Sequence, residues 1–192
     1  MSSLVESEKK TLLQVARDAL TAAITTASYF PADAAADSSL AQPGSAFVTI
    51  FRKGRLRGCI GQLSSKARLV DVVAHCAHAV ASQDPRFRPV QPEELPEIDI
   101  EISVLSELSD IKPEEIETGG HGLMVSSNSH RGVLLPQVAI QFHWNRIRFL
   151  EATCEKAGLS KDAWKNAGTR IQAFTAEVFS DEAEFRNYSS ST

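Results

Sequence analysis

The chain has 192 residues, of which 43% are hydrophobic and 23% are charged, values typical of a folded globular protein rather than a disordered one. A net charge of −4 argues against nucleic-acid binding by the whole surface, and three cysteines do not suggest a disulfide framework. Because the sequence shows neither an apolar signal segment nor a run of membrane-spanning length, we expect a cytoplasmic protein with reduced thiols and no membrane contact.

The first predicted element is a helix over residues 4–30, where apolar residues recur at helical spacing. Small and polar residues over 31–43 predict a surface loop. A hairpin follows over 47–63, in which two β-favouring segments flank a basic turn.

The second strand of this hairpin carries glycines on both sides of Cys59, at Gly58 and Gly61. Glycine inside a strand indicates a bulge, a tight bend or the close approach of another backbone or a ligand. The alternative is a hairpin whose glycines relieve crowding and whose cysteine is a small buried hydrophobe. The basic turn could also receive an anion.

A second helix is predicted over 67–82, with Cys76 on its apolar face. His75 and His78 fall near the opposite face without further ligands nearby, so we expect no metal site. Two prolines make residues 84–90 an extended, rigid loop.

Strict alternation predicts a strand over 97–105, which places Asp99 and Glu101 on one face. Such carboxylates can serve as acid and base, or can simply face solvent. His121 stands among glycines, where either an active-site loop or an ordinary turn fits.

The remaining pattern predicts a hairpin over 123–135, helices over 137–144 and 147–157, and a closing strand over 171–179. Cys154 falls on an apolar helical stripe and is expected in the core. This order indicates an α+β fold with a mixed, mainly antiparallel sheet flanked by helices, in a single domain over residues 1–192. The sequence contains no Gly-rich phosphate loop, dinucleotide fingerprint or zinc cluster, and we expect no cofactor.

Several sequence blocks lie in order along nearly the whole chain: Leu56-Arg-Gly-Cys-Ile-Gly61, Asp84-Pro-Arg-Phe-Arg-Pro-Val90, Glu101-Ile-Ser-Val-Leu-Ser106, Gly120-His-Gly122, Arg131-Gly-Val-Leu-Leu-Pro-Gln-Val138, Phe149-Leu-Glu-Ala-Thr-Cys-Glu-Lys-Ala-Gly-Leu159, the segment 162–164 and Phe174-Thr-Ala-Glu-Val-Phe179. They resemble the blocks of the AMMECR domain family, whose prokaryotic members are called AmmeMemoRadiSam system protein A. The resemblance implies an AMMECR-type fold with a larger and a smaller lobe that share a cleft. It also implies action together with Memo-like proteins and radical SAM enzymes. It does not imply a particular reaction.

One hypothesis is a thiol-dependent enzyme. Cys59 would be the nucleophile, and Arg57, which lies within the first block, would lower its pKa or bind an anionic substrate. His121 would act as the base, and Glu101 would orient this histidine.

The other hypothesis is a non-catalytic partner or substrate-binding module. Its groove would be formed by the hairpin at Arg57, Gly58 and Gly61 and by the loop that carries Arg86 and Phe87, and would take a partner protein or a small or anionic molecule. Nucleic-acid binding by the basic hairpin is a weaker alternative, because no aromatic platform is interleaved with its cations. Sequence alone leaves the first two hypotheses open.

Overall fold

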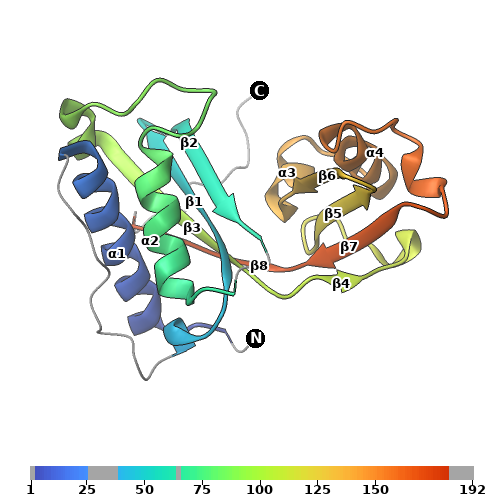
Figure 1. The fold of residues 1–192 in the computed structure, drawn as a ribbon, viewed down its shortest axis with the longest axis horizontal. Coiled ribbons are helices and arrows are strands. Elements are labelled where there is room, and N and C mark those ends of the chain that lie inside the picture. Colours follow the sequence, from blue (N-terminus) through green and yellow to red (C-terminus); the bar gives the residue numbers. More distant parts are fainter. Residues whose placement is uncertain (1–2, 26–38, 64–65, 182–192) are drawn as a thin grey trace. The chain divides into compact units, whose positions relative to one another are not determined.

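The computed structural model describes residues 3–25, 39–63 and 66–181 of the 192-residue chain. These residues form two compact units (Figure 1). The first unit contains the described residues up to Leu105 and those from Glu177 onward, and the second contains residues 106–176.

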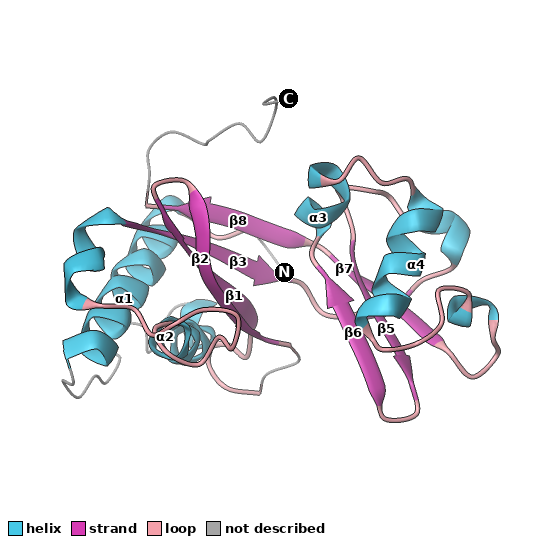
Figure 2. Ribbon diagram, turned by 90° about the horizontal axis from the view of Figure 1, so that it is seen from above, coloured by secondary structure: helices cyan, strands magenta, loops and turns pink. Residues whose placement is uncertain are grey.

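The first unit is a sheet with strand order β2-β1-β3-β8, covered by two helices (Figures 1 and 2). Strand β1 pairs antiparallel with both β2 and β3. A 3₁₀ helix, η2, leads into β3. The elements are α1 (Glu6–Thr25), β1 (Ser45–Arg52), β2 (Arg55–Gln62), α2 (Leu69–Val80), η2 (Pro92–Glu97), β3 (Ile98–Leu105) and β8 (Ala176–Ser180).

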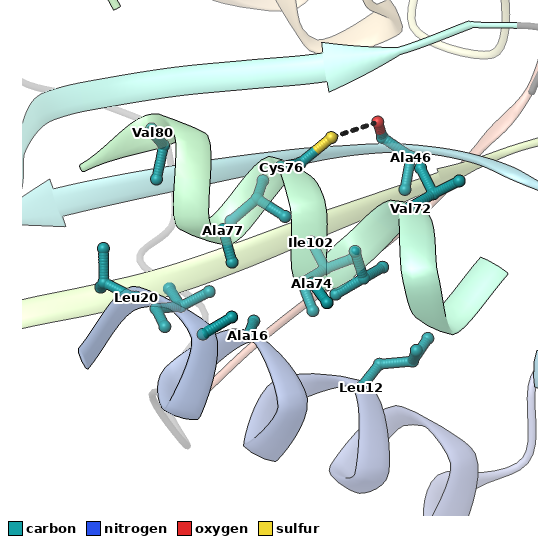
Figure 3. Packing of buried hydrophobic residues seen from close by; sticks show 14 of the residues in the cluster. Leu12, Ala16, Leu20, Ala46, Val72, Ala74, Cys76, Ala77, Val80 and Ile102 are labelled. Carbon is teal, nitrogen blue, oxygen red and sulfur yellow. Dashed lines mark hydrogen bonds between the residues drawn. The ribbon is translucent and has the colours of Figure 1, made fainter. Parts of the chain in front are cut away.

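Side chains along the strands of the first sheet point alternately to a core face, which the helices cover, and to the opposite face. Val48 and Ile50 of β1 and Ile102 of β3 are fully buried in one cluster with residues of both helices. Figure 3 shows Ile102 among residues of α1 and α2. The odd-numbered neighbours of these strand residues therefore point to the face away from the helices. Cys76 lies in this core and donates a hydrogen bond to the Ala46 carbonyl oxygen, and burial raises its pKa to about 12. The prediction that Cys76 is a core residue is confirmed.

The second unit is an antiparallel sheet with strand order β4-β7-β5-β6, packed against helices. Phe149, Leu150 and Cys154 of its longer helix are fully buried, as predicted for Cys154. That helix approaches β6 so closely that a Cβ atom on Gly132 would lie 2.3 Å from the Ala157 nitrogen. The elements are β4 (Ser109–Asp110), β5 (Gly122–Ser127), β6 (His130–Leu134), α3 (Pro136–Gln141), α4 (Arg146–Lys156) and β7 (Arg170–Phe174).

The predicted α+β class is confirmed, with helices flanking two antiparallel sheets. The prediction of one closing strand over 171–179 is wrong. The chain forms β7 in the second sheet and β8 in the first, and leaves the ladder at Thr175, whose N–H and carbonyl oxygen pair with Ser106. Local alternation continues through this point, so the pattern cannot reveal the change of partner strand.

Helix α1 ends at Thr25 within the predicted range 4–30, and residues 26–30 of that prediction lie outside the described residues. So do residues 31–38 of the predicted loop. Within the parts of the chain that the structure describes, no helix combines the length and hydropathy needed to cross a membrane.

Candidate functional site

Strand β2 carries a β-bulge next to Cys59. Ile50 pairs with Gly58 and Phe51 pairs with Leu56, so Arg57 has no opposite residue on β1. A bulge of this kind redirects a side chain, and here the Arg57 guanidinium reaches Glu94 of η2. Its Nε and Nη2 atoms donate to the two Glu94 carboxylate oxygens at 2.9 and 3.0 Å.

Glu94 is the centre of a small ion-pair network. Arg52 donates to the same carboxylate at 3.1 Å, and Arg57 makes the larger contribution that lowers the pKa of Glu94 to about 2. The Glu94 side chain is 11% exposed and that of Arg57 is 15% exposed. Arg57 therefore anchors β2 to η2, and its predicted role toward the thiol or an anionic substrate stays a prediction.

The two glycines around Cys59 make room for neighbouring side chains, as expected for glycines that relieve crowding. A Cβ atom on Gly58 would lie 2.9 Å from Val80 Cγ2 of α2. On Gly61 it would lie 2.0 Å from the ring of Phe47, its register partner on β1. Contact of a substrate with Gly58 or Gly61 stays a prediction.

Cys59 is half-buried and held by neighbours on both sides of its strand. On one side, the Thr49 hydroxyl of β1 donates to the Cys59 Sγ atom at 3.3 Å. On the other side, β2 is the edge of the sheet, and the Cys59 N–H donates to the Asp84 carboxylate at 2.9 Å. The Arg57 Nη2 atom also donates to the Pro89 carbonyl oxygen at 3.3 Å. The loop over 84–90 thus covers this edge.

Asp84 holds the loop together and positions Arg86. The Arg86 backbone N–H and Nε donate to Asp84 Oδ1 at 3.1 and 2.9 Å, and Nη2 donates to Oδ2 at 2.7 Å. These bonds hold the pKa of the buried Asp84 carboxyl well below its usual range. The Arg86 guanidinium lies 5.4 Å from the centre of the Phe87 ring.

Our sequence reasoning did not select Asp84. A signal was present, since an aspartate in a turn can accept a hydrogen bond from the N–H two residues later, as Asp84 does from Arg86.

Glu101 lies in line with Cys59 across the sheet. Thr49 pairs with Cys59 on β2 and with Glu101 on β3, so the three residues form a row on the face away from the helices. We call them the Cys59 row. Two strand spacings separate its ends, which places the Cα atoms of Cys59 and Glu101 about 10 Å apart. Burial raises the pKa of the Glu101 carboxyl.

Several groups around Cys59 act on the pKa of its thiol. Burial is the largest effect and raises its pKa. The Thr49 hydrogen bond and the charge of Arg86 act in the opposite direction, whereas Asp84 and Glu101 add to the rise. Because the thiolate is the nucleophilic form, a raised pKa keeps Cys59 protonated and weakly nucleophilic at neutral pH.

His121 belongs to the second unit, whereas Cys59 and Glu101 belong to the first. The Nδ1 atom of His121 accepts a hydrogen bond from the Glu117 backbone N–H at 3.1 Å, and the His121 backbone N–H donates to the Glu117 carbonyl oxygen at 2.9 Å. His121 thus closes a turn in which Gly119 adopts a φ of 87°. A role as catalytic base stays a prediction.

His75 and His78, the histidines considered for a metal, are exposed. The described residues contain no group of three or more potential metal ligands.

A family model described as AMMECR1 matches residues 13–179. The chain belongs to the AMMECR1 family. Its curated AMMECR1 relatives include a protein of Methanothermobacter thermautotrophicus, 42% identical over 143 residues that cover 71% of this chain and 74% of the relative. A protein of Thermococcus kodakarensis is 42% identical over 147 residues, which cover 71% and 72%.

A crystal structure of an uncharacterized protein from Pyrococcus horikoshii is similar to most of this chain. Its TM-score is 0.83 at 35% sequence identity, and the match covers 89% of this chain and 90% of that one. The family resemblance is therefore confirmed. The names of these relatives state no activity, so a function has to be argued from the site.

Proposed function

We propose that this AMMECR1-family chain is a binding module that recognises a ligand or partner at the Cys59 row and the adjoining loop over 84–90. The observation that supports this proposal best is the state of the Cys59 thiol. It is half-buried, accepts a hydrogen bond from Thr49 and has a raised pKa. Such a thiol is suited to contact a ligand and poorly suited to attack one.

The frame around the thiol is preorganised, which favours recognition. Arg57 and Glu94 fix the bulge, and Asp84 joins the edge of β2 to the guanidinium of Arg86. Each of these bonds involves a charged group, and such bonds are stronger than neutral ones. A rigid surface loses little conformational entropy when a ligand binds.

The partners in this proposal are those implied by the family, a Memo-like protein and a radical SAM enzyme. Arg86 is the side chain that we expect to matter most in contact with them, because it is 54% exposed and held in place by Asp84. We expect Arg86→Ala to weaken capture of a purified partner and Cys59→Ser to leave it nearly unchanged. The reverse pattern would contradict a binding role that does not depend on the thiol.

Alkylation of each cysteine in the folded protein, followed by mass spectrometry across pH, tests the state of the thiol. We expect Cys59 to react appreciably only above the ordinary thiol pKa near 8.5, and Cys76 and Cys154 to react only on unfolding. Fast reaction of Cys59 well below that pH would show an activated thiol and would overturn the proposal.

A thiol-dependent enzyme is the second candidate. It is favoured by the partial exposure of Cys59 and by the charge of Arg86, which lowers the pKa of the thiol against the larger effect of burial. In that case Cys59→Ser would abolish turnover, and His121→Ala and Glu101→Gln would reduce it.

A further inference from the structure

We infer that Glu101 receives the cationic group of a ligand, an ammonium or a guanidinium, at the end of the Cys59 row. This inference rests on the proposed binding function and names the chemistry that the site would select. It concerns only residues of the first unit.

No ion-pair partner is found for Glu101 in the part of the chain that the structure describes, whereas three other carboxylates near this strand are paired. Asp84 is paired with Arg86, Glu94 with Arg57, and Glu97 with Arg52 and Lys53. Among the described residues, no hydrogen bond or ion pair is found for the Glu101 carboxyl, which is half-buried and whose pKa burial raises. A carboxylate that is partly removed from water without a counter-charge is costly, so a cation that reaches it is stabilised.

The position of Glu101 explains why a ligand would reach it. Thr49 lies directly beside it on β1, and Cys59 lies beside Thr49 on β2. A hydroxyl and a half-buried thiol therefore line the approach to the carboxylate from the edge of the sheet. At the far end of the row, the Arg86 cation is already balanced by Asp84. The charge left uncompensated along the row is negative, which favours a cationic ligand over an anionic one.

Charged thiol reagents place a cation or an anion at Cys59 and so measure this preference. The probes are two methanethiosulfonates, one with a trimethylammonium-ethyl group and one with a sulfonatoethyl group. With both, the Cys59 sulfur forms a disulfide with the sulfenyl sulfur, methanesulfinate leaves with the bonding electron pair, and the thiol proton goes to solvent. The readout is the ratio of the two rates at Cys59 in the full chain, by mass spectrometry, relative to the same ratio for 2-mercaptoethanol, an uncharged thiol.

We expect the cationic reagent to be favoured three- to tenfold in the native protein. Glu101→Gln, which keeps the size of the side chain, should reduce the preference for the cationic reagent, while Asp84 stays in place in both proteins. Glu101→Asp retains the charge and should retain part of the preference. Glu93→Gln, a change at an exposed glutamate of η2, should leave the ratio unchanged.

An unchanged ratio in Glu101→Gln would overturn the inference, and a native preference for the anionic reagent would show that Arg86 makes this an anion site instead. These outcomes are separate from failure of the proposed function. An activated Cys59 would raise the rates of both reagents at low pH, but the ratio would still report the charge of Glu101.

Discussion

Replacing Glu94 with glutamine removes the charge that holds Arg57 and Arg52 while keeping the size of the side chain. One carbonyl oxygen remains to accept the Gln91 N–H, which donates to the native carboxylate at 2.8 Å. The change therefore tests the ion pairs of Glu94 more than its packing.

The size of the effect follows from the pKa of Glu94. The structure lowers it from an ordinary 4.5 to about 2, with Arg57 as the main cause. Each tenfold change in proton affinity is worth about 1.4 kcal/mol, and water screens the share that comes from the more exposed Arg52. We therefore expect Glu94→Gln to lower the free energy of unfolding by roughly 2 to 3 kcal/mol at pH 7.

The loss of stability in Glu94→Gln should depend on pH. A carboxyl with a depressed folded-state pKa contributes stability above its unfolded-state pKa and loses it as pH falls through the folded-state value. The native protein should lose the contribution of Glu94 between pH 4.5 and about 2, and its difference from Glu94→Gln should shrink over that window.

Urea unfolding of both proteins at several pH values measures this difference. Glu93→Gln, at the exposed neighbouring glutamate, is the matched control and should stay close to the native protein. A difference that persists undiminished down to pH 2.5, or one that is absent at pH 7, would refute the reasoning from the ion pairs.

The remaining predictions concern the glycines and can be measured by the same unfolding experiment. Gly61→Ala should lower the free energy of unfolding by about 1 to 3 kcal/mol, because the new methyl group meets the Phe47 ring. The loss should be smaller when Phe47 is also replaced by alanine. Equal losses with and without the Phe47 ring would contradict this clash. Gly132→Ala should cost more than about 3 kcal/mol, because the groups that it meets at 2.3 and 2.6 Å are backbone atoms of α4, which cannot rotate away as a side chain can. A stability equal to that of the native protein would show that α4 can move away from β6.

The sequence was sufficient to predict those features that depend on local periodicity. Helix α2 and strand β3 lie within one or two residues of the predicted ranges, because apolar spacing of 3.6 and of 2 is a property of consecutive residues. The same spacing placed Cys76 and Cys154 in the core. The ordered blocks also identified the family.

Only the tertiary structure determined which strands lie next to each other in the two sheets. The division of the predicted strand over 171–179 into β7 and β8 required knowledge of the two sheets, because alternation carries no information about which strand is adjacent.

The site shows the same limit. Glycines around a cysteine indicated a special strand, but only the register of β1 with β2 and β3 brings Cys59, Thr49 and Glu101 into a row. Only the packing of the loop over 84–90 against the edge of β2 gives Asp84 its role. The pKa of a thiol depends on its burial and on charges distant in sequence, so the rise in the pKa of Cys59 follows from the fold and not from its motif.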